Sequence, residues 1–317
     1  METTAVKAEG PERAKLRLTG ASLSWAALLL LVVIWGSTFA GIRIGVETIT
    51  PAWLVAGRLT SGALFLGVWI LGAKLLRTQK KPADAPKLSW RATGWFALIG
   101  IGATAVPFVF YAHAAESIGS AVMAISNGAT PFATVLLAHG LIGDRLTARR
   151  IIGVLLGFLG LVVLVLPEFG AGMGASLIGI LLAIFGAWLY GVGNVTTRMA
   201  PKIDTAVATF MIVGLGAVAA LAYALVMEPF PLNASAASIT AMIILGLLPT
   251  AFAMFVYVWL IRRSGPVFVS FTTYMSPLWA TGLGVLFLGE ELHWSMIGAL
   301  ALILTGVAVA NTPVRRT

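Results

Sequence analysis

Long apolar stretches separated by short polar connectors run through the chain from residue 22 onward. Each stretch is long enough to cross a bilayer as a helix, which takes about 20 residues. Lipid offers the backbone no hydrogen bonds, so a spanning segment of this kind is helical. The pattern predicts an all-α membrane protein with ten transmembrane helices, at 22–43, 52–73, 90–113, 119–141, 149–167, 176–197, 205–226, 237–260, 267–289 and 294–312.

The charges of the connectors alternate along the chain. All Lys and Arg residues except Arg43 and Arg58 lie at the N-terminus, at the C-terminus or in every second connector. The remaining connectors are acidic and hold Glu47, Glu116, Glu168, Glu228, Glu290 and Glu291. Because basic connectors stay in the cytoplasm, both termini are predicted to be cytoplasmic.

A helical hairpin at residues 117–167 is repeated 146 residues later at 263–313. The first turn, Asp144–Arg150, is net basic, whereas its counterpart Glu290–His293 is acidic, so the two copies are predicted to point in opposite directions. The identical pairs include residues that direct the backbone: Gly119/Gly265, Pro131/Pro277, Gly143/Gly289, Gly160/Gly306 and Pro167/Pro313.

The same shift extends into the third span of each half. It pairs Gly100 with Gly246, Thr104 with Thr250 and Tyr111 with Tyr257, and a proline interrupts both spans, at Pro107 and Pro249. The chain is therefore expected to form an inverted repeat of five plus five helices, at 22–167 and 176–312. Inverted repeats with interrupted helices are typical of transporters, whose substrate site lies near the midplane between the halves.

Composition agrees with a membrane protein and excludes other classes. The chain is 59% hydrophobic and 10% charged, against about 25% charged in soluble domains. The net charge of +9 is spread over connectors, so a membrane surface explains it better than nucleic acid. With no cysteine, disulfides and thiolate metal sites are excluded. Residues 1–21 are polar and are predicted to be a disordered cytoplasmic tail.

Several short motifs resemble the EamA family of the drug/metabolite transporter superfamily. They are Trp35-Gly-Ser-Thr-Phe, the Ala-Gly-Arg58-Leu stretch after Pro51, Asn127-Gly-Ala-Thr-Pro131 and Leu-Gly-Glu290-Glu291-Leu. The resemblance implies ten helices in an inverted repeat and the movement of small polar or amphipathic metabolites, often outward. Asp144-Arg145 departs from the acidic pair that such proteins often carry in the first half.

Arg58 is the most informative single residue, because it lies inside a predicted span. An Arg at that depth is costly, so we expect one of three arrangements. It anchors a substrate carboxylate or phosphate, it pairs with Glu47 to close the outer mouth, or it snorkels to the headgroups.

Polar and aromatic side chains within the spans form a second set of candidates. Buried hydroxyl, amide and indole groups need partners, which a water-filled cavity or a neighbouring helix supplies. His113 lies one turn from Glu116, so the two could exchange a proton or form a simple exposed pair. Pro131 and Pro277 are candidate hinges, with simple kinks as the alternative. The substrate-binding candidates are Trp35, Thr38, Arg58, Tyr111, His113, Asn127, Tyr190, Asn194, Tyr257 and Tyr274.

These features favour a secondary transporter that exports amino-acid-like or amphipathic metabolites by alternating access. An uncoupled channel is the alternative. A membrane-embedded enzyme is disfavoured because, apart from Arg58, the spans are almost free of charge. The chain also lacks nucleotide-binding, metalloprotease and hydrolase motifs, which disfavours ATP-driven transport. We expect no catalytic residue, no metal and no cofactor. The expected partners are a small-molecule substrate and the lipid bilayer, without nucleic acid and with a homodimer left open. The expected location is a bacterial inner membrane.

Overall fold

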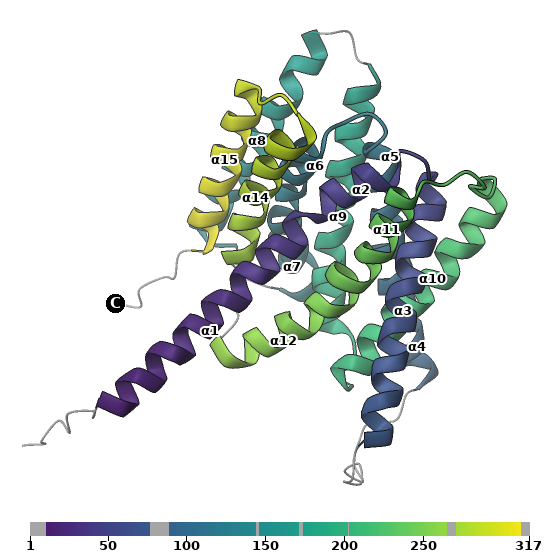
Figure 1. Cartoon of the computed structure of the whole chain (residues 1–317). Helices are drawn as coiled ribbons and strands as arrows, with labels where there is room; N and C mark the ends of the chain where they lie inside the picture. Colours follow the sequence, from purple (N-terminus) through teal and green to yellow (C-terminus); the bar gives the residue numbers. More distant parts are fainter. Residues whose placement is uncertain are drawn as a thin grey trace, which may run out of the picture.

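The computed structural model describes residues 11–76, 89–143, 146–170, 174–201, 203–264 and 271–311, and the secondary structure in these ranges is helical (Figure 1). The first half contains α1 (Pro11–Gly36), α2 (Thr38–Gly45), α3 (Pro51–Leu76), α4 (Trp90–Gly100), the π-helix η1 (Ile101–Ala105), α5 (Val106–Ala114), α6 (Ser120–Ser126), the 3₁₀ turn η2 (Asn127–Ala129), α7 (Thr130–Ile142) and α8 (Ala148–Gly170). The second half contains α9 (Ala175–Met199), α10 (Thr205–Met227), α11 (Ala236–Leu245), the π-helix η3 (Gly246–Phe252), α12 (Ala253–Ser264), α14 (Phe271–Leu288) and α15 (Trp294–Asn311).

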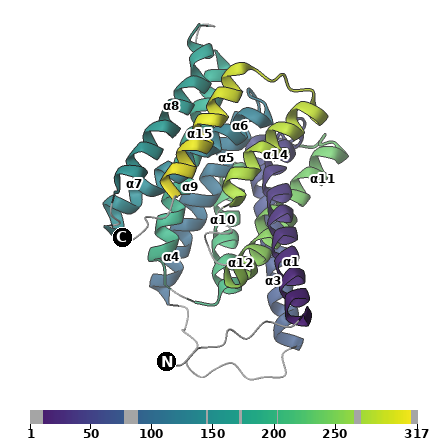
Figure 2. The ribbon, with the colours of Figure 1, turned by 90° about the vertical axis from the view of Figure 1, so that its left-hand side faces the viewer.

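The helices run along one bundle in alternating directions, as Figures 1 and 2 show. Within the described residues, eight helical segments are long and apolar enough to cross a membrane, and the shorter apolar helices Met275–Leu288 and Trp294–Val309 follow them. These shorter helices fall on the ninth and tenth predicted spans, of which residues 267–270 and 312 lie outside the described ranges. The protein is thus an all-helical, multi-pass integral membrane protein.

Many large apolar side chains lie on the outer surface of the bundle. Phe158, Val226 and Phe287 are 65%, 78% and 79% exposed, whereas the small side chains of Ala183 and Ala187 are fully buried. Helices that are apolar all round belong in lipid. Large side chains therefore face the bilayer, and small ones allow the helices to approach one another.

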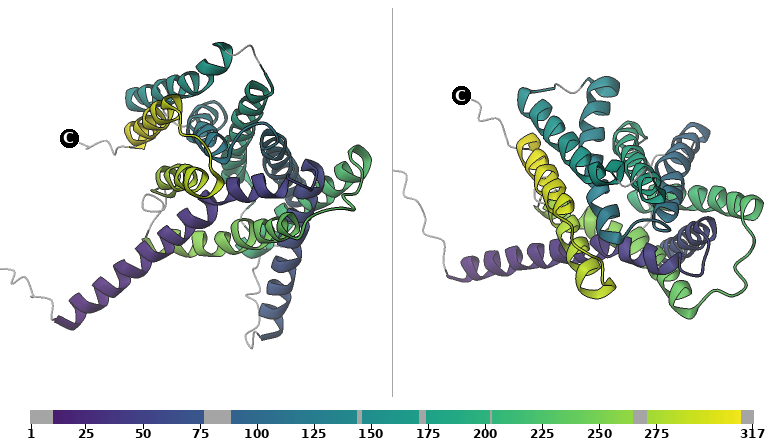
Figure 3. Two further views of the ribbon diagram at one scale, coloured as in Figure 1. Left: turned by 45° about the horizontal axis from the view of Figure 1, so that its top comes forward. Right: turned by 90° about the horizontal axis from the view of Figure 1, so that it is seen from above.

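Helices α8 and α15 show this close approach most clearly, and Figure 3 shows them side by side at the edge of the bundle. A Cβ atom on Gly306 would lie 2.5 Å from the carbonyl oxygen of Gly153, and one on Gly160 would lie 2.9 Å from that of Ala299. The backbones are in contact, which only glycine permits here.

The two π-helices occupy positions related by the 146-residue shift. In η1, the Thr104 hydroxyl donates to the carbonyl of Ile99 at 3.3 Å, and in η3 the Thr250 hydroxyl donates to that of Leu245 at 2.8 Å. The predicted interruptions near Pro107 and Pro249 are therefore π-helical insertions. Such insertions widen a helix locally and are frequent at functional sites.

The two ends of the bundle differ in charge. We call one of them the acidic end, because the connections there carry Glu47, Glu116, Glu228, Glu290 and Glu291. The opposite, basic end holds the described residues Lys74, Arg91, Arg149, Arg150, Arg198 and Arg263. Asp144 and Arg145 of the predicted basic turn lie outside the described residues.

The start of α1 differs from the prediction of a disordered tail over residues 1–21. The helix begins at Pro11. Proline is favoured at the first position of a helix, and the Glu, Arg, Ala, Lys and Leu residues that follow are good helix formers, so the helix extends into the tail. Residues 1–10 lie outside the described ranges.

Candidate functional site

A cavity of about 750 Å³ lies at the centre of the bundle, with walls from both halves. It extends from Phe39 and Ile42 of α2 to Pro201 and Ile203 in the α9–α10 connection, and so reaches the basic end. No described residue of α8 or α15 lines it. Eight of the ten predicted candidates line this cavity: Trp35, Thr38, Arg58, Tyr111, Asn127, Tyr190, Asn194 and Tyr257.

Arg58 lies about 10 Å along α3 from Pro51 and is only 5% exposed, which excludes snorkelling. Its Nε donates a hydrogen bond to the Thr250 hydroxyl at 3.0 Å, and its guanidinium carbon lies 3.7 Å from the centre of the Phe108 ring. No acidic side chain within the described part of the chain forms an ion pair with it. The predicted pairing with Glu47 is therefore wrong: the exposed Glu47 side chain does not reach Arg58.

Aromatic rings form a second part of the wall. Tyr111 and Tyr190 stack with ring centres 5.7 Å apart and an angle of 13° between their planes. Trp35 packs against Tyr257 at 5.4 Å, and its indole N–H donates to the carbonyl of Pro249 at 3.2 Å. The cavity thus offers flat aromatic faces beside a buried cation.

The interrupted helix α6–η2–α7 brings Asn127 to the cavity. Its side-chain oxygen accepts hydrogen bonds from the Tyr111 hydroxyl at 3.0 Å and from the Thr130 hydroxyl at 3.1 Å. Thr130 also donates to the carbonyl of Ala187 in α9 at 3.2 Å. Pro131 is the second residue of α7, close to this 3₁₀ turn, and such a turn within a helix often marks a hinge. Pro277 lines the cavity from α14.

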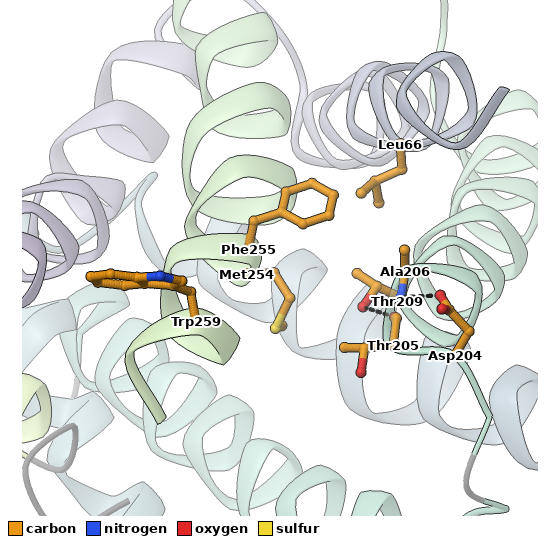
Figure 4. A pocket seen from close by; sticks show the side chains of 8 residues that line it. All are labelled: Leu66, Asp204, Thr205, Ala206, Thr209, Met254, Phe255 and Trp259. Atoms are coloured by element: carbon orange, nitrogen blue, oxygen red, sulfur yellow. Dashed lines mark hydrogen bonds between the residues drawn. The ribbon is translucent and has the colours of Figure 1, made fainter. Parts of the chain in front are cut away.

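A smaller pocket of about 280 Å³ adjoins the cavity at the basic end (Figure 4). It shares Thr205, Thr209 and Met254 with the main cavity. Asp204 lies at its edge and caps α10, with Oδ1 accepting from the backbone N–H groups of Ala206 and Val207. Because its carboxylate already accepts hydrogen bonds from the backbone, the role of Asp204 is to cap the helix.

Two predicted candidates do not contribute to the described cavity wall. His113 is partly exposed near the acidic end of α5, and its Nδ1 lies 3.1 Å from Glu116 Oε2. It is absent from the cavity lining. Tyr274 belongs to α14, but its side chain lies outside the described residues.

Sequence reasoning missed several polar side chains of the wall. Thr205 and Thr209 are one turn apart in an otherwise apolar helix, a spacing that could have identified them. Thr104, which also lines the cavity, was noted only as the repeat counterpart of Thr250. The other missed hydroxyl-bearing residues of the lining are Thr130, Thr197, Thr272 and Ser276. Nowhere in the described ranges do three or more His, Asp or Glu side chains cluster as metal ligands would.

The EamA-like transporter family matches the chain twice, over residues 23–166 and 177–312. The Escherichia coli (strain K12) protein named "Uncharacterized inner membrane transporter YedA" is 25% identical over 291 residues, which cover 90% of this chain and 91% of the relative. "Uncharacterized transporter YoaV" of Bacillus subtilis (strain 168) is 22% identical over 284 residues, with 88% and 94% covered.

The fold also matches a solved structure described only as "Crystal structure of protein". The two superpose with a TM-score of 0.61 at 22% identity, covering 95% of this chain and 100% of the other. At this identity the likeness concerns the fold alone.

Proposed function

The chain belongs to the EamA-like transporter family, and from that premise we propose that it is a secondary transporter that exports small carboxylated metabolites by alternating access. The substrates are amino-acid-like or otherwise amphipathic solutes. The membrane is a bacterial inner membrane, crossed ten times as an inverted repeat with the shorter α14 and α15 included. The basic end faces the cytoplasm.

The proposal is carried by the incomplete hydrogen bonding of the buried Arg58 side chain. Its guanidinium has five N–H donors, and among the described residues only the Thr250 hydroxyl accepts from it, at the Nε–H. Leaving a buried charge uncompensated costs about 3–5 kcal/mol, and the Phe108 ring offsets only part of this. A substrate carboxylate would bind the remaining donors in the paired geometry that arginine favours.

The rest of the wall supports a substrate with an apolar or aromatic body. The stacked Tyr111 and Tyr190 rings and the Trp35–Tyr257 pair are flat surfaces beside the cation. A volume of about 750 Å³ lies in the range of small-molecule sites, about 300–1,000 Å³. Amino acids and similar carboxylates combine the required charge, size and amphipathic character.

Alternating access is supported by the position of the cavity. It reaches the α9–α10 connection at the basic end, while hydrogen bonds join the two halves at the acidic end. With the proposed orientation, this arrangement is a state open to the cytoplasm, from which an exporter would load its substrate.

Uptake into proteoliposomes tests the substrate class. Pairs of amino acids and their methyl esters are compared in the parent protein and in Arg58→Gln. Loss of one partner of a buried charge pair costs about 2–5 kcal/mol, so kcat/KM for the acids should fall by about thirtyfold or more. The esters, which lack the carboxylate, should change little.

Arg91→Gln is the matched control, because it removes the same charge at the basic end from a side chain outside the cavity lining. It should leave the ratio of acid to ester transport unchanged. If Arg58→Gln transports acids as well as the parent does, the proposed substrate class is wrong. Flux that does not saturate would indicate a channel, and flux indifferent to an imposed pH gradient would exclude proton coupling.

A further inference from the structure

A carboxylate of the second half holds the start of a helix in the first half at the acidic end. Glu290, in the connection between α14 and α15, accepts hydrogen bonds from the backbone N–H groups of Ser120 and Ala121, at 2.6 Å to Oε1 and 2.9 Å to Oε2. These are free donors in the first turn of α6. A negative charge at the start of a helix is favourable both for its hydrogen bonds and for the helix dipole.

Three glycines shape the space that Glu290 occupies. A Cβ atom on Gly119 would lie 2.8 Å from the carboxyl carbon of Glu290, and one on Gly284 would lie 2.5 Å from Oε2. Gly289, with φ +64°, reverses the chain after α14, so that the Glu290 N–H bonds the Gly284 carbonyl at 3.1 Å. The backbone is therefore built around this carboxylate.

A second carboxylate of the second half makes the equivalent contact with α3. Glu228, at the end of α10, accepts from the Ala52 N–H at 3.0 Å through Oε2, and its carbonyl accepts from the Trp53 indole at 3.2 Å. Beside it, the Thr48 hydroxyl accepts from the N–H of Ser235 at 2.9 Å. Both acidic contacts therefore cross between the two halves matched by the family.

The two helices held in this way carry polar residues of the cavity. Arg58 lies on α3, two turns beyond Ala52, and Asn127 follows α6 directly. If the halves rock apart at the acidic end, the backbone donors of α3 and α6 move away from Glu228 and Glu290. The cavity cannot open there while both contacts persist.

We propose that Glu290 and Glu228 are positioning residues of an acidic-end seal, which holds α3 and α6 against the second half while the cavity is open at the basic end. The seal consists of these two carboxylates and their backbone partners. Breaking it is the step that exposes the cavity to the outside. This inference rests on the proposed alternating access but not on the proposed substrate.

Cysteine accessibility tests the seal without any substrate. The chain has no cysteine, so Thr38→Cys places a single thiol in the cavity wall. A membrane-impermeant maleimide is applied to intact cells, which expose the acidic end, and to inverted vesicles, which expose the basic end. Glu290→Ala should raise labelling from the acidic end about tenfold, since a hydrogen bond to a charged group contributes more than the free energy of a tenfold change.

Labelling from the basic end should fall in the same variant, because the protein then spends less time open to that side. Glu290→Gln keeps one acceptor oxygen and should fall between the parent and Glu290→Ala. Glu291→Gln is the matched control, because Glu291 is the next residue in the chain but its side chain is 87% exposed. Its Oε2 lies 3.9 Å from His293 Nε2. It should label as the parent does.

Unchanged labelling from the acidic end in Glu290→Ala would overturn the proposal. So would faster labelling from both sides, which indicates a loosened fold instead of a shifted equilibrium. If Glu290→Ala does not accumulate in the membrane, Glu228→Gln and Gly119→Ala are compared in the same way, the latter displacing the carboxylate without removing it. Absence of carboxylate transport would refute the substrate class and leave these labelling results unaffected.

Discussion

The π-helices η1 and η3 occupy equivalent positions in the two halves but differ in their chemistry. In each, a threonine hydroxyl donates to the carbonyl five residues earlier. In η3, the Thr250 oxygen also accepts the hydrogen bond of Arg58, whereas Thr104 in η1 contacts no charged side chain in the described part of the chain.

The difference arises in the helices that pack on these two segments. A Cβ on Gly246 would meet the carbonyl of Arg58 at 2.4 Å, and one on the equivalent Gly100 would meet that of Ile212 at 2.2 Å. Ile212 therefore occupies in α10 the place that Arg58 occupies in α3. The repeat builds two similar scaffolds, and this difference makes the cavity between them asymmetric: among its described lining residues, only Arg58 carries a charge.

The largest effect within this comparison is expected for Thr250→Val. Valine keeps the shape but leaves the Arg58 Nε–H without its acceptor, which costs about 1–3 kcal/mol. Carboxylate transport should lose about tenfold in kcat/KM, because the guanidinium is no longer held in one orientation. Proteoliposome uptake of the acids measures this.

Thr250→Ser is the control for that change. It retains the hydroxyl and loses only a methyl group, so it should restore most of the lost transport. If Thr250→Ser is as impaired as Thr250→Val, the methyl group packed in η3 matters and the hydrogen bond to Arg58 does not.

Sequence reasoning predicted the all-helical membrane fold, because the bilayer imposes a simple rule on the length and polarity of helices. Hydropathy located the helices, and the repeat of Gly143 and Gly289 corresponds to the left-handed ends of α7 and α14, with φ of 70° and 64°. Hydropathy did not reveal where α1 begins, since a helix continues into polar sequence when its residues favour helix.

The site was only partly predictable. Arg58 was identified by its polarity within an apolar span, but its partner Thr250 lies 192 positions away, and only the packing of α3 on η3 brings them together. His113 was chosen as a polar side chain in the same predicted span as Tyr111. Two residues along a helix are about 200° apart around its axis, so the two side chains leave α5 in nearly opposite directions.

A smaller effect on transport is expected when the tyrosines of the repeat pair Tyr111 and Tyr257 are each replaced by phenylalanine. The Tyr111 hydroxyl donates to Asn127, whereas that of Tyr257 has no hydrogen bond in the described part of the chain and only its ring packs, on Trp35. Tyr111→Phe should lower kcat/KM about fivefold, as the loss of about 1 kcal/mol predicts. Tyr257→Phe should change it less than about twofold. Equal losses would mean that the substrate itself binds the Tyr257 hydroxyl.

The smallest effect is expected for Thr104→Val, the counterpart of Thr250→Val. The Thr104 hydroxyl faces the cavity but bonds only a carbonyl of its own helix at 3.3 Å. Such a bond contributes little, so kcat/KM for the acids should change less than about twofold. A loss as large as that of Thr250→Val would show that the substrate contacts both π-helices. The cavity would then bind substrate symmetrically, and the difference between Arg58 on α3 and Ile212 on α10 would have no role in binding.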